Sequence, residues 1–387
     1  MNNRFFLIGF SLFCLVATSH CASPKPVEKS IESERDGSKE QETTTFNLGL
    51  EHLEKEHYQA AIIEFDKLLS ENPQSEFELV ALFNKASALE GLGKCEEAAE
   101  LYRQIVRITG TKYQHIKAQS LFRLSYCFEC LGQTRKQIAS LKDAFKRKGN
   151  LPEEVGQAEL PARLAAAYAS LGNLKLAEKY FALAQKGLKA SYSEKRNQNI
   201  RKNLLARTLF FMGRTQPKWP SSTHQAEAYM GSLKYLQGYL LKSAEMGSPE
   251  WSPRSAKNLI EAYEFVWKLL AQAPPFAENP KKDKPAINSG AEDKELALHH
   301  QKKWQGRLAL KAFENIQTLK NMRFPDANES QEVKGIFLEI DRQEKKLQAF
   351  LTELAPNNEL TPTAQRKEGL LREGRIQSSP SILEKKS

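Results

Sequence analysis

The sequence predicts an all-α protein: helix hairpins stacked in tandem as an α-solenoid, followed by a further helical region. Apolar residues recur with a period of about 3.6 through much of residues 45–354, which is the pattern of amphipathic helices. Four such patterns end in Leu-Gly or Met-Gly, and the spacing of their glycines is 39, 40 and 41 residues: Gly93, Gly132, Gly172 and Gly213. A glycine there can adopt the left-handed conformation that ends one helix and turns the chain into the next.

The chain begins with a segment typical of export. Residues 5–18 form the longest apolar run, which is shorter than the roughly 20 residues that span a bilayer but suits the core of a secretory signal. We therefore expect a signal peptide over residues 1–20. The polar, charged residues 21–44 that follow predict a disordered tether.

Two fates remain open at the end of this signal. An ordinary signal peptidase could cut at Ala17-Thr18-Ser19, or a lipoprotein peptidase could cut before Cys21, whose thiol would then carry a lipid. Thr18 and His20 match a lipobox poorly. Lipidation at Cys21 would attach the chain to a membrane, and we expect a lipoprotein of the bacterial envelope at the periplasmic face of the outer membrane.

Small and aromatic residues recur at fixed positions of five segments, which begin at residues 42, 79, 118, 158 and 199. Position 8 is small in all five: Gly49, Ala86, Ser125, Ala165 and Ala206. Position 20 holds Ala61, Ala98, Gln137 and Ala177, and position 24 holds Phe65, Tyr102, Leu141 and Phe181. Small side chains let two helices approach, and the large one fills the space beneath them.

These residues resemble the tetratricopeptide repeat (TPR), over residues 45–215. The resemblance implies about five helix hairpins whose inner helices line a concave groove for a protein or peptide partner. Positions 6 and 9 of each repeat would face this groove: Asn47, Asn84, Arg123, Tyr126, Arg163 and Arg207. Asparagine amides can pair with a peptide backbone and arginines can hold carboxylates, so an acidic or C-terminal peptide would fit. Gln119 stands where a carboxylate-clamp TPR has lysine.

Residues 216–354 predict further helices that cap the repeats. Helical patterns cover about 222–246, 252–271, 294–321 and 329–354, with an exposed loop at 274–293. Residues 355–387 lack periodicity and predict a disordered tail.

Charge is separated along the repeats. Residues 46–102 contain 12 acidic and 4 basic residues, whereas residues 103–214 contain 7 acidic and 22 basic ones. The basic repeats three to five favour an alternative function, the binding of an anionic envelope polymer or lipid headgroups. We expect no nucleic-acid partner, because the chain is expected outside the cytoplasm and carries no nucleic-acid-binding motif.

Three cysteines fall in neighbouring repeats. Cys95 begins the outer helix of repeat two, and Cys127 and Cys130 lie near the end of the inner helix of repeat three, so Cys95 can bridge one of the two. Three buried free thiols are the alternative. The chain has no HExxH pair, phosphate-binding loop or GxSxG, and we expect no catalytic residues, cofactor or metal. The prediction is a non-enzymatic interaction scaffold.

Overall fold

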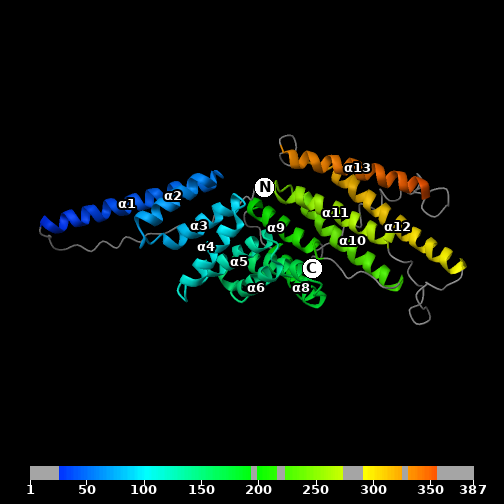
Figure 1. The fold of residues 1–387 in the computed structure, drawn as a ribbon, viewed down its shortest axis with the longest axis horizontal. Helices are drawn as coiled ribbons and strands as arrows, with labels where there is room; N and C mark the ends of the chain where they lie inside the picture. Colours follow the sequence, from blue (N-terminus) through cyan, green and yellow to red (C-terminus); the bar gives the residue numbers. More distant parts are fainter. Residues whose placement is uncertain (1–25, 193–197, 216–222, 273–290, 325–329, 355–387) are drawn as a thin grey trace, which may run out of the picture. The chain divides into compact units, whose positions relative to one another are not determined.

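The computed structural model describes residues 26–192, 198–215, 223–272, 291–324 and 330–354. Over these ranges the protein consists of helices joined by turns, without strands, so the all-α prediction is confirmed (Figure 1). The chain divides into two compact units, Met1–Leu151 and Pro152–Ser387, and each is described here by itself.

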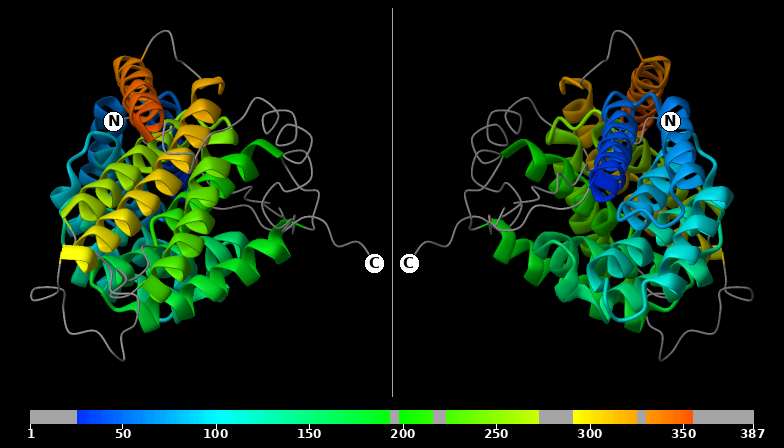
Figure 2. Two further views of the ribbon diagram at one scale, coloured as in Figure 1. Left: turned by 90° about the vertical axis from the view of Figure 1, so that its right-hand side faces the viewer. Right: turned by 90° about the vertical axis from the view of Figure 1, so that its left-hand side faces the viewer.

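The first unit consists of three helix hairpins that follow one another along the chain (Figure 2). Its helices are α1 (Pro26–Glu54), α2 (Tyr58–Glu71), α3 (Glu78–Gly91), α4 (Cys95–Ile108), α5 (Gln114–Cys130) and α6 (Thr134–Phe145), followed by a 3₁₀ turn, η1 (Lys148–Asn150). The inner helix α3 packs against both α1 and α5, as expected for stacked hairpins.

The small and large positions of the repeats meet as the sequence predicts. A Cβ added at Gly49 on α1 would lie 2.6 Å from the ring of Phe65 on α2, so only a glycine allows this approach. Phe65, Tyr102 and Leu141 are fully buried, as are Ala61 and Ala98. The predicted hairpin packing is therefore confirmed in this unit.

Three of the four predicted helix-ending glycines turn the chain. Gly93, Gly132 and Gly172 have φ values of 75°, 67° and 72°. After the first of them, the N–H of Lys94 donates to the carbonyl of Leu89, which closes a Schellman-type C-cap.

Gly213 is the last residue of a helix of the second unit, as predicted, but it does not adopt the left-handed conformation. That unit contains a π-helical segment, η2 (Val155–Glu159), and the helices α7 (Leu160–Ser170), α8 (Leu174–Tyr192), α9 (Gln198–Gly213), α10 (Thr223–Glu245), α11 (Trp251–Gln272), α12 (Ala291–Lys320) and α13 (Gln331–Leu354). A Cβ on Gly213 would lie 2.5 Å from Leu240 of α10. The glycine therefore admits a neighbouring helix.

Helices α7 and α8 form one hairpin, and α9 and α10 form the next. The hydroxyl of Ser243 on α10 donates to the carbonyl of Ala206 on α9 at 2.6 Å, so two small residues again mark the helix crossing. The fifth hairpin thus extends to Glu245, past residue 215, where we placed the end of the repeats. Beyond it, α11 packs against α9, α10, α12 and α13 in one apolar core.

The ends of the predicted segments differ from the structure in several places. Helix α12 begins at Ala291, so the last three residues of the predicted loop at 274–293 are helical. Helix α1 already begins at Pro26 and so includes most of the predicted tether; Glu, Lys and Gln are good helix formers. Helix α11 begins at Trp251, one residue before the predicted start, and the hydroxyl of Ser248 accepts the N–H of Trp251 at 3.2 Å.

The signal peptide, Cys21, residues 274–290 of the predicted loop and the tail lie outside the described residues. Within the described part, none of the helices has the length and apolarity needed to cross a membrane.

Candidate functional site

Asn47 and Asn84 occupy equivalent positions on two inner helices that pack together, α1 and α3. Asn47 is exposed and Asn84 is partly exposed. Neither side-chain amide hydrogen-bonds to another described residue of this chain. Both amides therefore remain available to a ligand, and their role in binding one stays a prediction.

Arg123, expected to face the groove, is bound within the chain. It projects from α5 and forms an ion pair with Glu90 of α3, and the two side chains are only 14% and 3% exposed. The guanidinium carbon also lies 4.9 Å from the centre of the Tyr126 ring, so two predicted groove residues contact each other. This buried pair joins the inner helices of repeats two and three.

A second buried pair of the same kind lies in the other unit. A guanidinium nitrogen of Arg207 on α9 is 2.6 Å from a carboxylate oxygen of Glu159 in η2, and the two side chains are 12% and 0% exposed. Arg163 is only 1% exposed, and its guanidinium carbon lies 4.4 Å from the centre of the Phe211 ring.

The predicted role of the arginines is therefore wrong for Arg163, which no groove ligand can reach. Arg123 and Arg207 already hold carboxylates of their own chain. Sequence reasoning missed both partners, Glu90 and Glu159. A signal was present at Glu90, which directly follows the apolar residues Ala88 and Leu89 near the end of α3.

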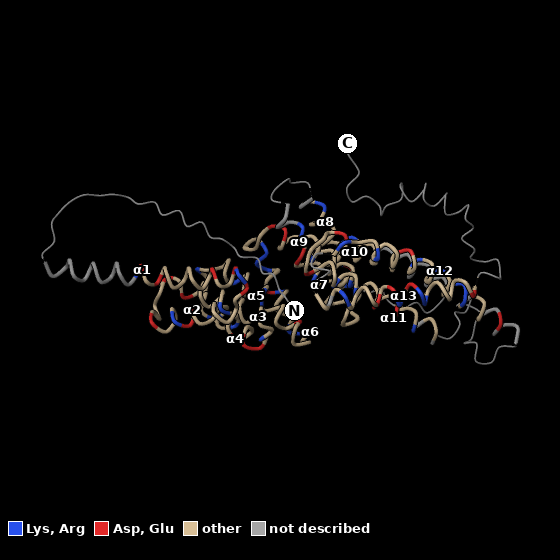
Figure 3. Tube along the Cα trace, turned by 90° about the horizontal axis from the view of Figure 1, so that it is seen from above, with Lys and Arg blue, Asp and Glu red and all other residues tan. Residues whose placement is uncertain are grey.

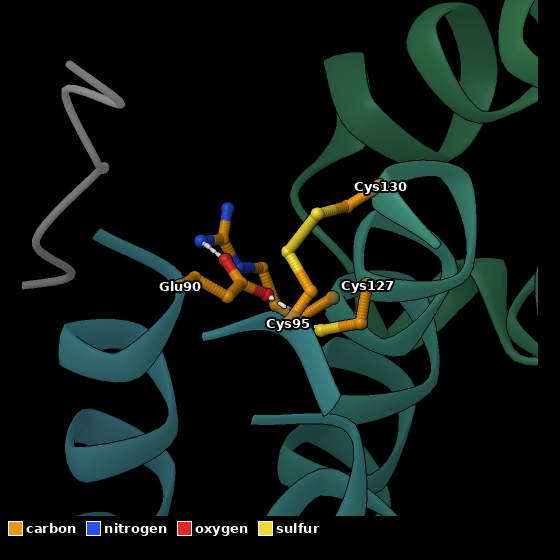
Figure 4. The surroundings of a disulfide bond; sticks show 5 residues. Glu90, Cys95, Cys127 and Cys130 are labelled. Atoms are coloured by element: carbon orange, nitrogen blue, oxygen red, sulfur yellow. Dashed lines mark hydrogen bonds and ion pairs between the residues drawn. A yellow bond between two sulfur atoms is a disulfide. The ribbon is translucent and has the colours of Figure 1, made fainter. Parts of the chain in front are cut away.

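The cysteines of repeats two and three lie beside Glu90 (Figure 4). Cys95 and Cys130 form a disulfide with their Cα atoms 6.4 Å apart, so of the two partners left open for Cys95 the structure contains Cys130. Cys130 is exposed, whereas Cys127 is a buried free thiol.

Cys127 is held in its protonated form. Its thiol donates a hydrogen bond to Glu90, with 3.4 Å between sulfur and oxygen. Burial raises the pKa of Cys127, and the negative charge of Glu90 raises it further, against the opposing effect of Arg123. Because thiols react as thiolates, Cys127 is no nucleophile at neutral pH.

Tyr102 completes the buried polar cluster. Its hydroxyl lies 3.1 Å from that of Ser87, and burial together with the charge of Glu90 raises its pKa. For Arg123, burial alone would lower the pKa, but the neighbouring Glu90 carboxylate more than offsets this and raises it. All of these groups keep their ordinary protonation states at neutral pH, and the cluster is a connection between repeats.

Among the described residues, no group of three His, Cys, Asp or Glu side chains could hold a metal ion. A cavity between α11, α12 and α13, lined by residues that include Tyr263 and Trp267, has a volume of about 20 Å³. That volume suits one water molecule.

No protein-family model matches this chain. No curated protein matches it either. Sixteen chains of solved structures do match. One of them, the TPR2AB domain of yeast Sti1 in complex with pHSP90, is 14% identical over 80% of this chain and 99% of its own, with a TM-score of 0.30. A superposition that loose supports no further inference, so the fold class rests on the hairpins of this chain itself.

Proposed function

We propose that this chain is a non-enzymatic scaffold of the bacterial envelope that binds a protein or peptide partner along the inner helices α1 and α3. The observation that carries the proposal is the pair Asn47 and Asn84, two available amides at equivalent positions of neighbouring inner helices. Each amide offers a donor and an acceptor, as a peptide bond does. An extended segment of a partner can therefore pair its backbone with both.

The character of the partner follows from what surrounds these amides. Val80, at position 2 of the same repeat as Asn84, is 37% exposed and provides an apolar contact. Acidic residues outnumber basic ones by 12 to 4 over residues 46–102. Since the arginines expected to attract carboxylates are bound internally, we expect a partner segment that is neutral or basic.

The placement in the envelope rests on the apolar run at residues 5–18 and on Cys21. It is tested by labelling cells with an alkyne-bearing fatty acid. We expect labelled wild-type chain and unlabelled Cys21→Ser chain. An unlabelled but exported wild type would show a cleaved signal without an anchor.

Photo-crosslinking tests the groove itself. A benzoylphenylalanine placed at position 47 or 84 should crosslink one partner of defined mass in intact cells. The matched controls are Gln59 on α2 and Glu96 on α4, exposed residues of the outer helices. Equal crosslinking from inner and outer positions, or none from positions 47 and 84, would contradict the proposal.

The double variant Asn47→Ala/Asn84→Ala supplies the energetic test once the partner is purified. Loss of two hydrogen bonds of about 1 kcal/mol each should weaken binding by at least about tenfold. Gln59→Ala should leave the affinity unchanged.

A further inference from the structure

The outer helix α8 has a narrow row of basic side chains on its surface. Lys175, Lys179, Lys186 and Lys189 are all exposed, and we call these four the lysine stripe. At about 100° per residue they fall within a sector of roughly 80°, and at 1.5 Å per residue the row is about 21 Å long. Ala182, also exposed, lies in the middle of the row. Lys and Arg are marked along the chain in Figure 3.

The lysine stripe is not neutralised by ion pairs within the described part of the chain. None of its four ammonium groups forms an ion pair with a described carboxylate, and the single acidic residue of α8 is Glu178. Like charges three or four residues apart, such as Lys175 and Lys179, destabilise a helix. These four lysines therefore do not stabilise the fold, which indicates that they serve to bind a ligand.

Part of this arrangement recurs in the first unit. Arg135 and Lys142 of α6 and Lys146 just after it are exposed, with Ala139 between them, but Lys146 pairs with Asp143. These residues stand at repeat positions 18, 25 and 29, where α8 has Lys175, Ala182 and Lys186. The first repeat lacks the pattern, since α2 has Gln59, Asp66 and Ser70 at these positions. The second repeat has Glu96, Arg103 and Arg107 there, but both arginines pair with Glu100 of the same helix. Four exposed lysines without an ion pair to a described carboxylate therefore distinguish α8 from the outer helices of the first three repeats.

The composition of the lysine stripe identifies the kind of ligand. A protein interface is anchored by buried aromatic residues and arginines, and lysine is depleted from its centre. The surface row on α8 consists of the four lysines of the lysine stripe and Ala182. Lysine is a compact point charge on a flexible stem, which suits a diffuse array of negative charges better than one planar carboxylate. A surface of anionic lipid headgroups is such an array.

We propose that the lysine stripe of α8 binds the surface of an anionic phospholipid membrane. This second activity is independent of the groove at Asn47 and Asn84. It holds the second unit against a lipid surface without insertion of any apolar segment. Each lysine near an anionic surface contributes about 1 kcal/mol, so four together change the partition coefficient by roughly a hundredfold or more.

Vesicle cosedimentation tests this proposal. The full chain with Cys21→Ser, which excludes any acyl anchor, is mixed with vesicles of phosphatidylglycerol and phosphatidylcholine in equal parts, or of phosphatidylcholine alone. We expect binding to the first vesicles only, and a loss of this binding at high salt, because screening weakens exposed charges.

Two charge-reversed proteins locate the contact. The test variant changes all four residues of the lysine stripe to Glu. The control variant changes four exposed lysines of the same unit to Glu: Lys302, Lys303, Lys334 and Lys345. Both carry the same net charge, and circular dichroism melting shows that both remain folded. We expect at least a hundredfold weaker partition for the test variant and less than a threefold change for the control.

Each other outcome overturns the assignment. A wild-type chain that stays in the supernatant with anionic vesicles at low salt removes the proposal. Equal loss in test and control variants means that net charge alone governs binding. A chain that binds soluble heparin but no vesicle has a different polyanion as its ligand. If the melts show that the test variant has lost its fold, Lys→Gln at the same four positions repeats the comparison, and unchanged binding there contradicts the proposal.

Discussion

The thiol of Cys127 donates its hydrogen to Glu90, a residue 37 positions earlier in the chain, across 3.4 Å. The same carboxylate holds Arg123, so one glutamate of α3 binds two groups of α5. Both partners depend on the carboxylate being ionised and shielded from water. The contact therefore couples the protonation of a buried thiol to the stacking of two hairpins.

This relationship predicts a loss of stability at alkaline pH. The pKa of Cys127 is raised in the folded protein, while an unfolded thiol ionises near pH 8.5. Above about pH 8.5 the unfolded chain binds fewer protons than the folded one, so the free energy of unfolding falls by up to about 1.4 kcal/mol per pH unit. Below that pH the contribution is fully present. Urea unfolding at pH 7.5, 8.5 and 9.5 measures the slope.

The matched variant for this slope is Cys127→Ser, which removes the titrating group. Its free energy of unfolding should decline less between pH 8.5 and 9.5 than that of the wild type. Measurements stay below pH 10 because Tyr102, whose pKa is also raised, would contribute there. Identical slopes in both proteins would show that Cys127 titrates normally.

The buried pair of Glu159 and Arg207 should be costly to break. Glu159→Gln removes the carboxylate that pairs with the buried guanidinium of Arg207, and we expect a loss of about 3–5 kcal/mol in the free energy of unfolding. Chemical denaturation followed by circular dichroism gives this value. The double variant Glu159→Gln/Arg207→Gln should recover part of the loss.

An exposed pair supplies the comparison. Lys146 and Asp143 on α6 lie 2.8 Å apart, with side chains 68% and 48% exposed. Lys146→Gln should cost less than about 1 kcal/mol. A similar loss of stability in Lys146→Gln and Glu159→Gln would mean that breaking a buried ion pair is no more destabilising than breaking an exposed one.

Two glycines should respond in opposite ways to alanine. A Cβ on Gly187 of α8 would lie 1.9 Å from the carbonyl oxygen of Gln157, so Gly187→Ala must push α8 from η2 and should cost about 1–3 kcal/mol or more. Gly335 lies in α13 with open space around it, and Gly335→Ala should stabilise the protein by about 0.5–1 kcal/mol. Thermal melts of both variants measure these changes in stability. A stabilised Gly187→Ala would contradict the contact.

The disulfide should stabilise the first unit. It links residues 35 apart, for which chain entropy predicts about 4 kcal/mol. Cys130→Ser should lower the free energy of unfolding by up to that amount, and the stability of this variant should no longer change when a reductant is added. Cys127→Ser should keep its sensitivity, because its disulfide is intact. Loss of sensitivity in Cys127→Ser instead would mean that Cys95 pairs with Cys127 in solution.

Local signals in the sequence were sufficient for the helices and most of their ends. Gly93, Gly132 and Gly172 end helices in the left-handed conformation. This conformation could be predicted, because it depends only on a glycine directly after the end of an apolar helical pattern. Gly213 carries the same local signal, but its role is to leave room for Leu240, which lies on another helix. A close approach of this kind has no signature within its own segment.

The site was less accessible to sequence reasoning. Repeat positions indicate which face of a helix an arginine occupies, but not whether a carboxylate meets it there. The partners of Arg123 and Arg207 are 33 and 48 residues away, so their pairing depends on the stacking of hairpins. The N-terminal part of α1 was missed for another reason: it is a helix without the apolar periodicity on which the prediction relied.

The ion pair of Glu90 and Arg123 also constrains how this protein can evolve. A neutral residue at either position removes the opposite charge from a buried ion pair, so a lineage that loses one should lose the other within few substitutions. The two columns are then expected to covary in an alignment of descendants, with swapped signs or two apolar residues as the tolerated pairs. The exposed asparagines should change independently of them, at a pace set by whatever they bind.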